Sequence, residues 1–220
     1  MSFKNKVKVV GTVVGTDWKS RGSLPAVLTY RIRVRDGLSG KDGARDFTCF
    51  AVLGHCRKDP VLFSGSLMGK RVVAEGKLCQ YKSDLSGWDS QIMLDVMRAP
   101  EKEHEASDCC DVKLEGIVRN VMRTEDSSLD VLLSMGDAFD APCVSCSVPG
   151  SLSDSEKALF AEGSRVHVTG KLSESRFTEI FGINGITEYV DVGRVRPFRS
   201  MDVAPVKETF RGQESCGMEW

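Results

Sequence analysis

An internal repeat is the feature of this 220-residue sequence that most constrains its fold. Residues 69–78 (GKRVVAEGKL) match residues 163–172 (GSRVHVTGKL) at six of ten positions. Residues 7–14 (VKVVGTVV) likewise correspond to residues 112–119 (VKLEGIVR), with a lysine and a glycine in the same places. A repeat of this kind indicates two copies of one structural unit in a single chain.

The first copy has the pattern of five β-strands and one connector. Its β-branched runs and alternating apolar residues predict strands at 7–14, 28–35, 47–53, 69–78 and 92–96. The connector, at 55–68, is a poor helix or an irregular segment, because Gly65 and two serines weaken a helix there. Five strands with a connector between the third and the fourth is the order of an OB-fold, a small β-barrel.

The second copy repeats this order. Strands are predicted at 112–119, 129–135, 143–150 and 163–172, with a last strand pair through 177–192. Ser153 and Glu156 have the spacing of a capping box, which predicts a better helix at about 154–162 as the connector of this copy. The predicted fold class is therefore all-β, with two tandem five-stranded OB-fold barrels, each having a short helix or connector between strands 3 and 4.

The repeat also sets the predicted domain boundaries. Residues 1–98 form the first OB-fold and residues 112–196 the second. Between them, residues 99–111 are charged, without apolar periodicity, and are predicted to be a linker. Residues 197–220 contain prolines, glycines and mixed charges, which predicts a flexible tail.

Charge differs between the two halves of the chain. The formal net charge is −1, but residues 1–100 contain 17 Lys and Arg against 9 Asp and Glu, and residues 101–220 contain 13 against 22. The halves therefore have net charges of +8 and −9. A basic half attracts phosphate, whereas an acidic half favours solubility, repulsion of misplaced polyanion or docking of a protein. The simpler alternative is that this segregation only sets solubility.

The strand predicted at 28–35 has two unlike faces. Arg31, Arg33 and Arg35 alternate with apolar residues, so a strand places the arginines on one face and a core stripe on the other. A glycine-rich hairpin loop follows, and Phe47 begins the returning strand. Arginines beside an aromatic residue on a twisted antiparallel pair suit a flexible polyanion with flat bases.

Four segments of the first copy resemble the bacterial single-stranded DNA-binding proteins, the SSB type of OB-fold. They are 6–11 (KVKVVG), 30–34 (YRIRV), 46–54 (DFTCFAVLG) and 69–78, in that family's order and near its spacing. The resemblance covers about the first 98 residues and recurs more weakly over 112–192.

The resemblance implies binding of single-stranded DNA, with base stacking on an aromatic residue that opens the third strand, here Phe47. Leu53 stands where the family has a second aromatic residue, and Trp18, Tyr81 or Trp88 could replace it. Two folds in one chain also differ from the family's usual single-fold tetramer.

We therefore predict a nucleic-acid-binding site on the first copy. Single-strand binding needs cations for phosphates and aromatic faces for bases. The predicted stacking residues are Phe47, Trp18, Tyr81 and Trp88, and the predicted phosphate contacts are Arg31, Arg33, Arg35, Lys19, Arg21, Lys41, Arg45, Lys77 and Lys82. The alternative is that Phe47 lies in the core and that the arginines form a solvated face.

The second copy does not repeat this chemistry. Its second strand has Asp130 and no arginine, and Cys143 stands where Phe47 stands in the first copy. We therefore expect residues 112–220 to mediate homo-oligomerisation or contacts with replication or recombination proteins, and to reject nucleic acid from the wrong face.

The sequence favours neither a metal site nor an enzyme. Cys143 and Cys146 are three apart on a predicted strand, where they point to opposite faces, so zinc binding with Cys109 and Cys110 is disfavoured. His55, His104 and His167 have no Ser, Cys or carboxylate at catalytic spacing, and no cofactor is predicted. The eight cysteines are expected to be reduced thiols of a cytoplasmic protein, since no export signal or membrane-spanning stretch is evident.

The sequence-based interpretation is a non-enzymatic protein that coats and protects single-stranded DNA, without strong sequence preference, during replication, recombination or repair. One alternative is binding of single-stranded RNA, which the same face allows. Another is an OB-fold assembly module with no nucleic-acid role.

Overall fold

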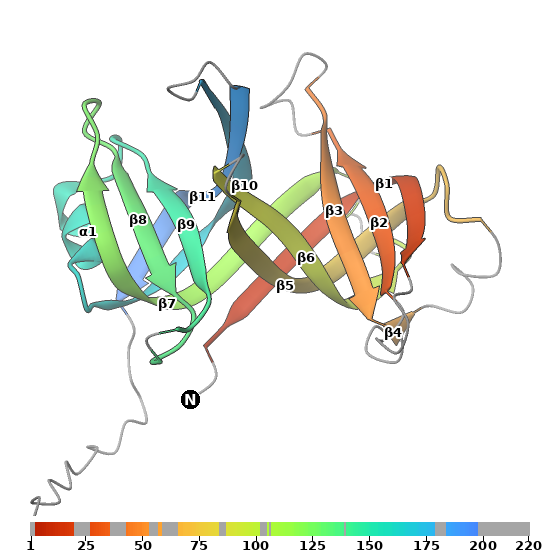
Figure 1. Cartoon of the computed structure of the whole chain (residues 1–220), viewed down its shortest axis with the longest axis horizontal. Coiled ribbons are helices and arrows are strands. Elements are labelled where there is room, and N and C mark those ends of the chain that lie inside the picture. The colour runs from red at the N-terminus through yellow and green to blue at the C-terminus, as the bar shows by residue number, and fades with distance from the viewer. Residues whose placement is uncertain are drawn as a thin grey trace, which may run out of the picture.

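The chain folds almost entirely into β-strands (Figure 1). The computed structural model describes residues 3–19, 27–35, 43–52, 57–58, 66–83, 87–101, 105, 107–138, 140–178 and 184–197. The first unit comprises β1 (Asn5–Lys19), β2 (Val27–Val34), β3 (Arg45–Val52), β4 (Arg57–Lys58), β5 (Arg71–Ser83) and β6 (Gly87–Arg98). The all-β prediction is confirmed.

The second unit comprises β7 (Cys109–Arg123), β8 (Leu129–Ser134), β9 (Cys143–Val148), α1 (Asp154–Lys157), the 3-10 turn η2 (Ala158–Phe160), β10 (Arg165–Thr178) and β11 (Asn184–Pro197). The predicted capping box is present at α1, where the Ser153 hydroxyl accepts from the Glu156 backbone N–H and the Glu156 carboxylate accepts from that of Ser153. Within the described residues, no helix is long and apolar enough to cross a membrane.

The strands of the first unit close into a five-stranded barrel. β1 pairs with β2 and β5, β2 pairs with β3, and β5 pairs with β6, all antiparallel. A parallel contact between β3 and β6 completes the ring, as in an OB-fold. β4 is a two-residue addition beside β6, in the segment predicted to be a connector.

The strands of the second unit pair in the same cyclic order. β7 pairs with β8 and β10, β8 with β9, and β10 with β11, all antiparallel, and β9 pairs in parallel with β11. The short helix lies between β9 and β10, where the repeat predicts it.

The two units are joined by an antiparallel pairing of β1 with β7. In Figure 1 these two strands run side by side from one unit to the other. Val7 lies opposite Val112, and these valines occupy the same position in the repeat. The joint is therefore nearly symmetric about this pair, as a two-fold contact between identical units would be. It also merges all strands into one 11-stranded sheet and one continuous hydrophobic core.

The repeat in the sequence has a geometric basis. Gly69 and Gly163 have φ values of 77° and 81°, which a residue with a β-carbon rarely adopts. The backbone N–H of Gly69 donates to the Val13 carbonyl at 2.9 Å, and that of Gly163 donates to the Val118 carbonyl at 2.8 Å. Each unit thus begins its fourth barrel strand with the same turn.

The segment predicted to be a linker is partly built into the structure. β7 begins at Cys109, and Glu105 is only 1% exposed. The Glu105 carboxylate accepts from Lys8 Nζ at 2.8 Å and from the Arg98 guanidinium at 2.7 and 2.9 Å. These bonds hold the pKa of Glu105 well below its usual range. The connection between the units is therefore fixed to β1 and β6.

Candidate nucleic-acid interface

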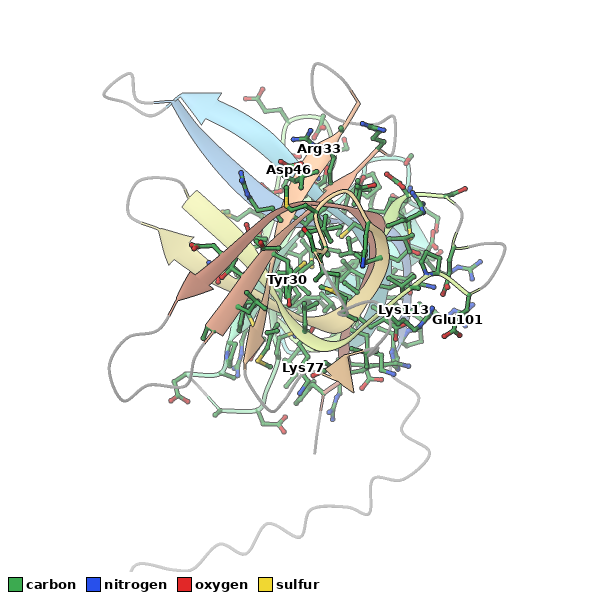
Figure 2. The ribbon with its side chains drawn as sticks, turned by 90° about the vertical axis from the view of Figure 1, so that its right-hand side faces the viewer. Tyr30, Arg33, Asp46, Lys77, Glu101 and Lys113 are labelled. Carbon is green, nitrogen blue, oxygen red and sulfur yellow. The ribbon has the colours of Figure 1, made fainter. Side chains whose placement is uncertain are left out.

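An exposed arginine face lies on the outer side of β1, β2 and β3. Arg31 and Arg33 on β2 and Arg35 directly after it are exposed, whereas the alternating Tyr30, Ile32 and Val34 are buried. The predicted division of this strand into a core face and a cationic face is confirmed. Figure 2 shows Tyr30 towards the middle of the barrel and Arg33 beside Asp46 at its edge.

Strand register places small and polar residues around the arginines. Arg31 lies opposite Gly15 on β1 and Thr48 on β3. A β-carbon at Gly15 would lie 2.6 Å from Arg31 Nε, so the glycine leaves room for this side chain to lie across β1. The face is consequently open and cationic at its centre.

One of the three arginines is already paired. Arg33 Nε lies 2.7 Å from Asp46 Oδ1, and Arg33 Nη2 lies 2.9 Å from Oδ2, which is a bidentate salt bridge across β2 and β3. The Arg33 and Asp46 side chains are 44% and 31% exposed, so the pair is accessible to a competing anion. For Arg31 and Arg35, no described carboxylate lies within 4.0 Å.

A cleft of about 580 Å³ lies at the edge of this face. Its cationic lining is Arg33, Arg35, Arg71 and Lys171. Sequence reasoning missed two of these cations. Arg71 lies on β5 opposite Thr12 of β1, and Lys171 belongs to β10 of the second unit. Only the folded arrangement brings Lys171 beside the first unit, although the repeat makes it the counterpart of Lys77.

Asp108 is the one carboxylate that lines the cleft within the described residues. One of its oxygens forms a salt bridge with Arg71 Nη1 and the other accepts from the Arg35 backbone N–H at 2.7 Å. Asp108 therefore holds the Arg71 side chain and the Arg35 backbone in place. The four cations that line the cleft outnumber this one carboxylate, so the cleft has a net positive charge.

The prediction that Phe47 stacks on a base is wrong for this structure. Phe47 lies opposite Ile32 and is 3% exposed within the core. Arg45 shares the inward face of β3 and is 6% exposed, so it does not line the surface either. Its Nη1 donates to the Leu172 carbonyl at 2.7 Å, and its guanidinium carbon lies 5.0 Å from the centre of the Phe47 ring. Arg45 therefore joins the two units, and the Phe47 ring packs against its guanidinium.

Phe50 is the phenylalanine on the outward face of β3. It lies opposite Thr29, in the row next to Arg31 and Thr48, and is half-buried. Alternation had required one of Phe47 and Phe50 to lie outside the core, and the pairing register of β3 selects Phe50. An aromatic ring thus does lie on the arginine face.

The other predicted residues are placed differently. Lys77 is exposed on β5, and Figure 2 shows it across the molecule from Arg33. Arg21 and Lys41 lie outside the described residues. For the remainder only the backbone is described: they lie at the ends of strands β1, β5 and β6 and are Trp18, Lys19, Tyr81, Lys82 and Trp88.

The described cysteines show no sign of activation. Cys49, Cys110 and Cys146 are buried, and burial raises the pKa of each thiol. Burial also raises the pKa of Cys109 to about 11. These thiols stay protonated at neutral pH, which is the opposite of what a nucleophile or a metal ligand needs. Among the described residues, no group of three or more His, Cys, Asp or Glu side chains could hold a metal ion.

The fold matches a known protein in three dimensions. A deletion variant of the single-stranded DNA-binding protein from Thermus aquaticus superimposes with a TM-score of 0.63 and 16% identity, over 94% of this chain and 99% of that one. The wild-type protein gives a TM-score of 0.61 and 16% identity, over 93% and 98% of the two chains. This chain has the fold of a bacterial single-stranded DNA-binding protein.

Comparisons of the sequence with known proteins do not find this match. No protein-family model matches the chain, and no curated protein matches its sequence significantly. The overlap with fission yeast Pot1 bound to single-stranded DNA, at a TM-score of 0.28 and 9% identity, is too low to indicate a shared fold. The resemblance to the SSB type of OB-fold is confirmed at the level of fold.

Proposed function

We propose that this chain binds single-stranded DNA without strong sequence preference and so coats and protects it. The observation that supports this most directly is the exposed arginine face of β1, β2 and β3, with its adjoining cationic cleft. It occurs in a fold shared with the Thermus aquaticus single-stranded DNA-binding protein.

The face has the two components that such binding requires. Arg31, Arg33 and Arg35 offer positive charge to phosphates, and Phe50 offers a ring to a base. None of these contacts selects one base over another, because phosphates are common to all nucleotides and every base has a face that stacks. Sequence-tolerant binding follows from this composition.

The second unit is assigned a different role. Through β7 it occupies the edge of β1 that would otherwise be open for pairing with another chain. Within this proposal it acts as a built-in partner for the first unit. Contacts with further copies or with replication and recombination proteins through residues 112–220 remain our prediction.

A charge-matched pair of variants tests the proposal. Replacing Arg31 and Arg35 by Ala should weaken binding of a fluorescent oligo-dT, because two phosphate contacts are lost. In single-stranded DNA each contact contributes about −0.7 to the slope of log affinity against log salt, so the slope should become about 1.4 less negative.

The control variant replaces Arg119 and Arg123, two exposed arginines of β7 outside this face, and should bind like the wild type. Equal losses in both variants would mean that total charge, and not this face, determines affinity. Competition between DNA and RNA oligomers of matched sequence separates the DNA-binding proposal from the RNA alternative.

A further inference from the structure

One row of residues crosses four strands of the first barrel and contains two arginines. Asp46 on β3 lies opposite Arg33 on β2, which lies opposite Thr12 on β1. Thr12 in turn lies opposite Arg71 on β5. Residues directly opposite each other on paired strands point to the same side of the sheet. The row therefore extends the arginine face from β2 across β1 to β5, where Arg33, Thr12 and Arg71 line the cationic cleft.

Each arginine of this row is bound to a carboxylate of the chain. At the β3 end, Asp46 accepts two hydrogen bonds from Arg33, at 2.7 and 2.9 Å, and Figure 2 shows the two side chains together. At the β5 end, one oxygen of Asp108 forms a salt bridge with Arg71 Nη1. Carboxylate and phosphate oxygens bind guanidinium groups in the same geometry. The two carboxylates thus occupy positions that phosphates of a bound strand can take.

Asp108 belongs to the segment that connects the two units, and this segment is fixed on both sides of it. On one side Glu105 is 1% exposed, and its carboxylate accepts from side chains of β1 and β6. On the other side β7 begins at Cys109. Asp108 can therefore leave Arg71 by rotation of its own side chain, while the connecting segment stays in place.

Only one of the two contacts of Asp108 depends on its charge. Its second oxygen accepts from the Arg35 backbone N–H at 2.7 Å, a bond that a neutral amide or hydroxyl oxygen can also accept. The salt bridge with Arg71 requires the carboxylate. The Arg71 side chain is 33% exposed and that of Asp108 is 11% exposed, so an anion in the cleft can reach the arginine while it is paired.

The arginines of the first unit supply most of the positive charge of the cleft. Lys171, the cation that β10 contributes, lies opposite Asp111 on β7 and Asp191 on β11. These two carboxylates offset the charge of Lys171. Arg71 is therefore the residue beyond the arginine face that is best placed to bind a phosphate in the cleft.

We propose that Arg71 is a phosphate contact for single-stranded DNA, and that Asp108 is its resident competitor, a carboxylate that a phosphate of the DNA displaces. A strand on the arginine face then continues across Thr12 to β5. This assignment rests on the proposed function and adds a regulatory residue to it. The segment between the units thereby limits the affinity of the first unit for DNA.

Two variants of the full chain remove the charge of Asp108. D108N and D108S both carry an acceptor for the Arg35 N–H, but neither can form the salt bridge with Arg71. Each should bind fluorescent oligo-dT more tightly than the wild type, by up to about fivefold at low salt. The slope of log affinity against log salt should become about 0.7 more negative, because in the wild type the displaced carboxylate takes up a cation as the phosphate releases one.

A double-mutant cycle distinguishes competition at Arg71 from an effect of total charge. In R71A the phosphate contact is absent, so D108N should no longer raise the affinity, and R71A/D108N should bind like R71A. The control is D140N, which removes an exposed carboxylate of the second unit and should bind like the wild type.

A second measurement needs no substitution at the site. The carboxyl ¹³C NMR signal of Asp108 should shift when oligo-dT saturates the wild type, because the carboxylate loses its bond to Arg71. The signal of Asp140 should not shift. An unshifted Asp108 signal would show that the salt bridge persists in the complex and would overturn the inference.

Two results of the variants would also overturn it. A gain in D108N that persists in R71A would mean that Asp108 acts through the total charge of the protein. Unchanged or weaker binding by D108N and D108S would identify Asp108 as a structural residue of the joint. Failure of the wild type to bind oligo-dT at low salt would instead remove the proposed function, and this inference with it.

Discussion

Opposite faces of β3 give two nearby phenylalanines different roles. Phe47 is buried in the core, whereas Phe50 lies on the outward face with Arg31. We expect F47A to lower the free energy of unfolding by about 3 to 5 kcal/mol, as for other buried phenylalanines. F50A should lose one base contact worth about 1 to 3 kcal/mol of binding, with a smaller loss of stability.

Chemical denaturation and fluorescence anisotropy with oligo-dT measure the two effects in parallel. A stable F47A variant with weakened DNA binding would restore Phe47 as the stacking residue. Wild-type affinity in F50A would remove Phe50 from the interface.

The salt bridge between Arg33 and Asp46 predicts that removal of a carboxylate strengthens binding. In D46N, Arg33 can bind a phosphate without first breaking a salt bridge to the Asp46 carboxylate. Exposed pairs of this kind are worth about 0.2 to 1 kcal/mol, so affinity for oligo-dT should rise up to about fivefold at low salt.

D130N, which removes an exposed carboxylate from β8, is the control and should have little effect on affinity. An equal gain in both variants would show that Asp46 acts only through the total charge of the protein.

Sequence reasoning at this scale located the arginine face but not its aromatic partner. Alternation required one of Phe47 and Phe50 to be outside the core, and the family resemblance favoured Phe47. The pairing of Ile32 with Phe47 decides the matter, and this register depends on the whole barrel.

At the scale of elements, Glu105 predicts a pH dependence of stability. Its pKa is lowered in the folded state, so the ionised carboxylate stabilises the fold at neutral pH. This stabilisation should be lost progressively as the pH falls below 4.5, the ordinary value for the group. E105Q should therefore have a lower Tm than the wild type at pH 7.

The difference in Tm should shrink as the pH falls below that value. Thermal unfolding of both proteins from pH 7 to pH 3 measures it. A constant difference over this range would mean that the Gln side chain disturbs packing and that the charge of Glu105 is not involved.

The bulge at Gly193 of β11, which faces Thr169 and Gly170 of β10, predicts unequal effects at two facing glycines. A β-carbon at Gly170 would lie 2.1 Å from the Asp191 carbonyl oxygen, whereas at Gly193 the nearest atom, the Thr169 carbonyl oxygen, would be 3.7 Å away. G170A should cost about 1 to 3 kcal/mol of stability, and G193A much less.

Urea denaturation of the two variants measures this difference. Equal stability of both would mean that β10 can shift to accommodate a side chain at Gly170. The equivalent Gly76 in β5 has the same restriction, since a β-carbon there would lie 2.0 Å from the Met93 carbonyl oxygen.

For the whole molecule, local patterns predicted more of the fold than of the site. Each barrel strand was expected near its observed position, because alternation and β-branched runs are local signals. The pairing of β1 with β7, the burial of Glu105 and the approach of Lys171 to the arginine face are contacts between distant segments. No pattern within one strand encodes them.

The net charge of a sequence segment also fails to locate the binding site. Summed over halves of the sequence, it predicted a basic unit that binds DNA and an acidic unit that rejects it. The structure places cations and carboxylates together on β7, β10 and β11 of the second unit, where Lys171 lies opposite both Asp111 and Asp191. Only the three-dimensional arrangement locates the cationic cleft, which Lys171 of the second unit lines together with Arg33, Arg35 and Arg71 of the first.

Titration of the full chain with fluorescent oligo-dT at several salt concentrations tests whether this chain binds single-stranded DNA. We expect saturable binding whose affinity falls with salt, with a log–log slope of about −0.7 for each neutralised phosphate. Absence of binding at low salt, or binding whose affinity does not depend on salt, would contradict it.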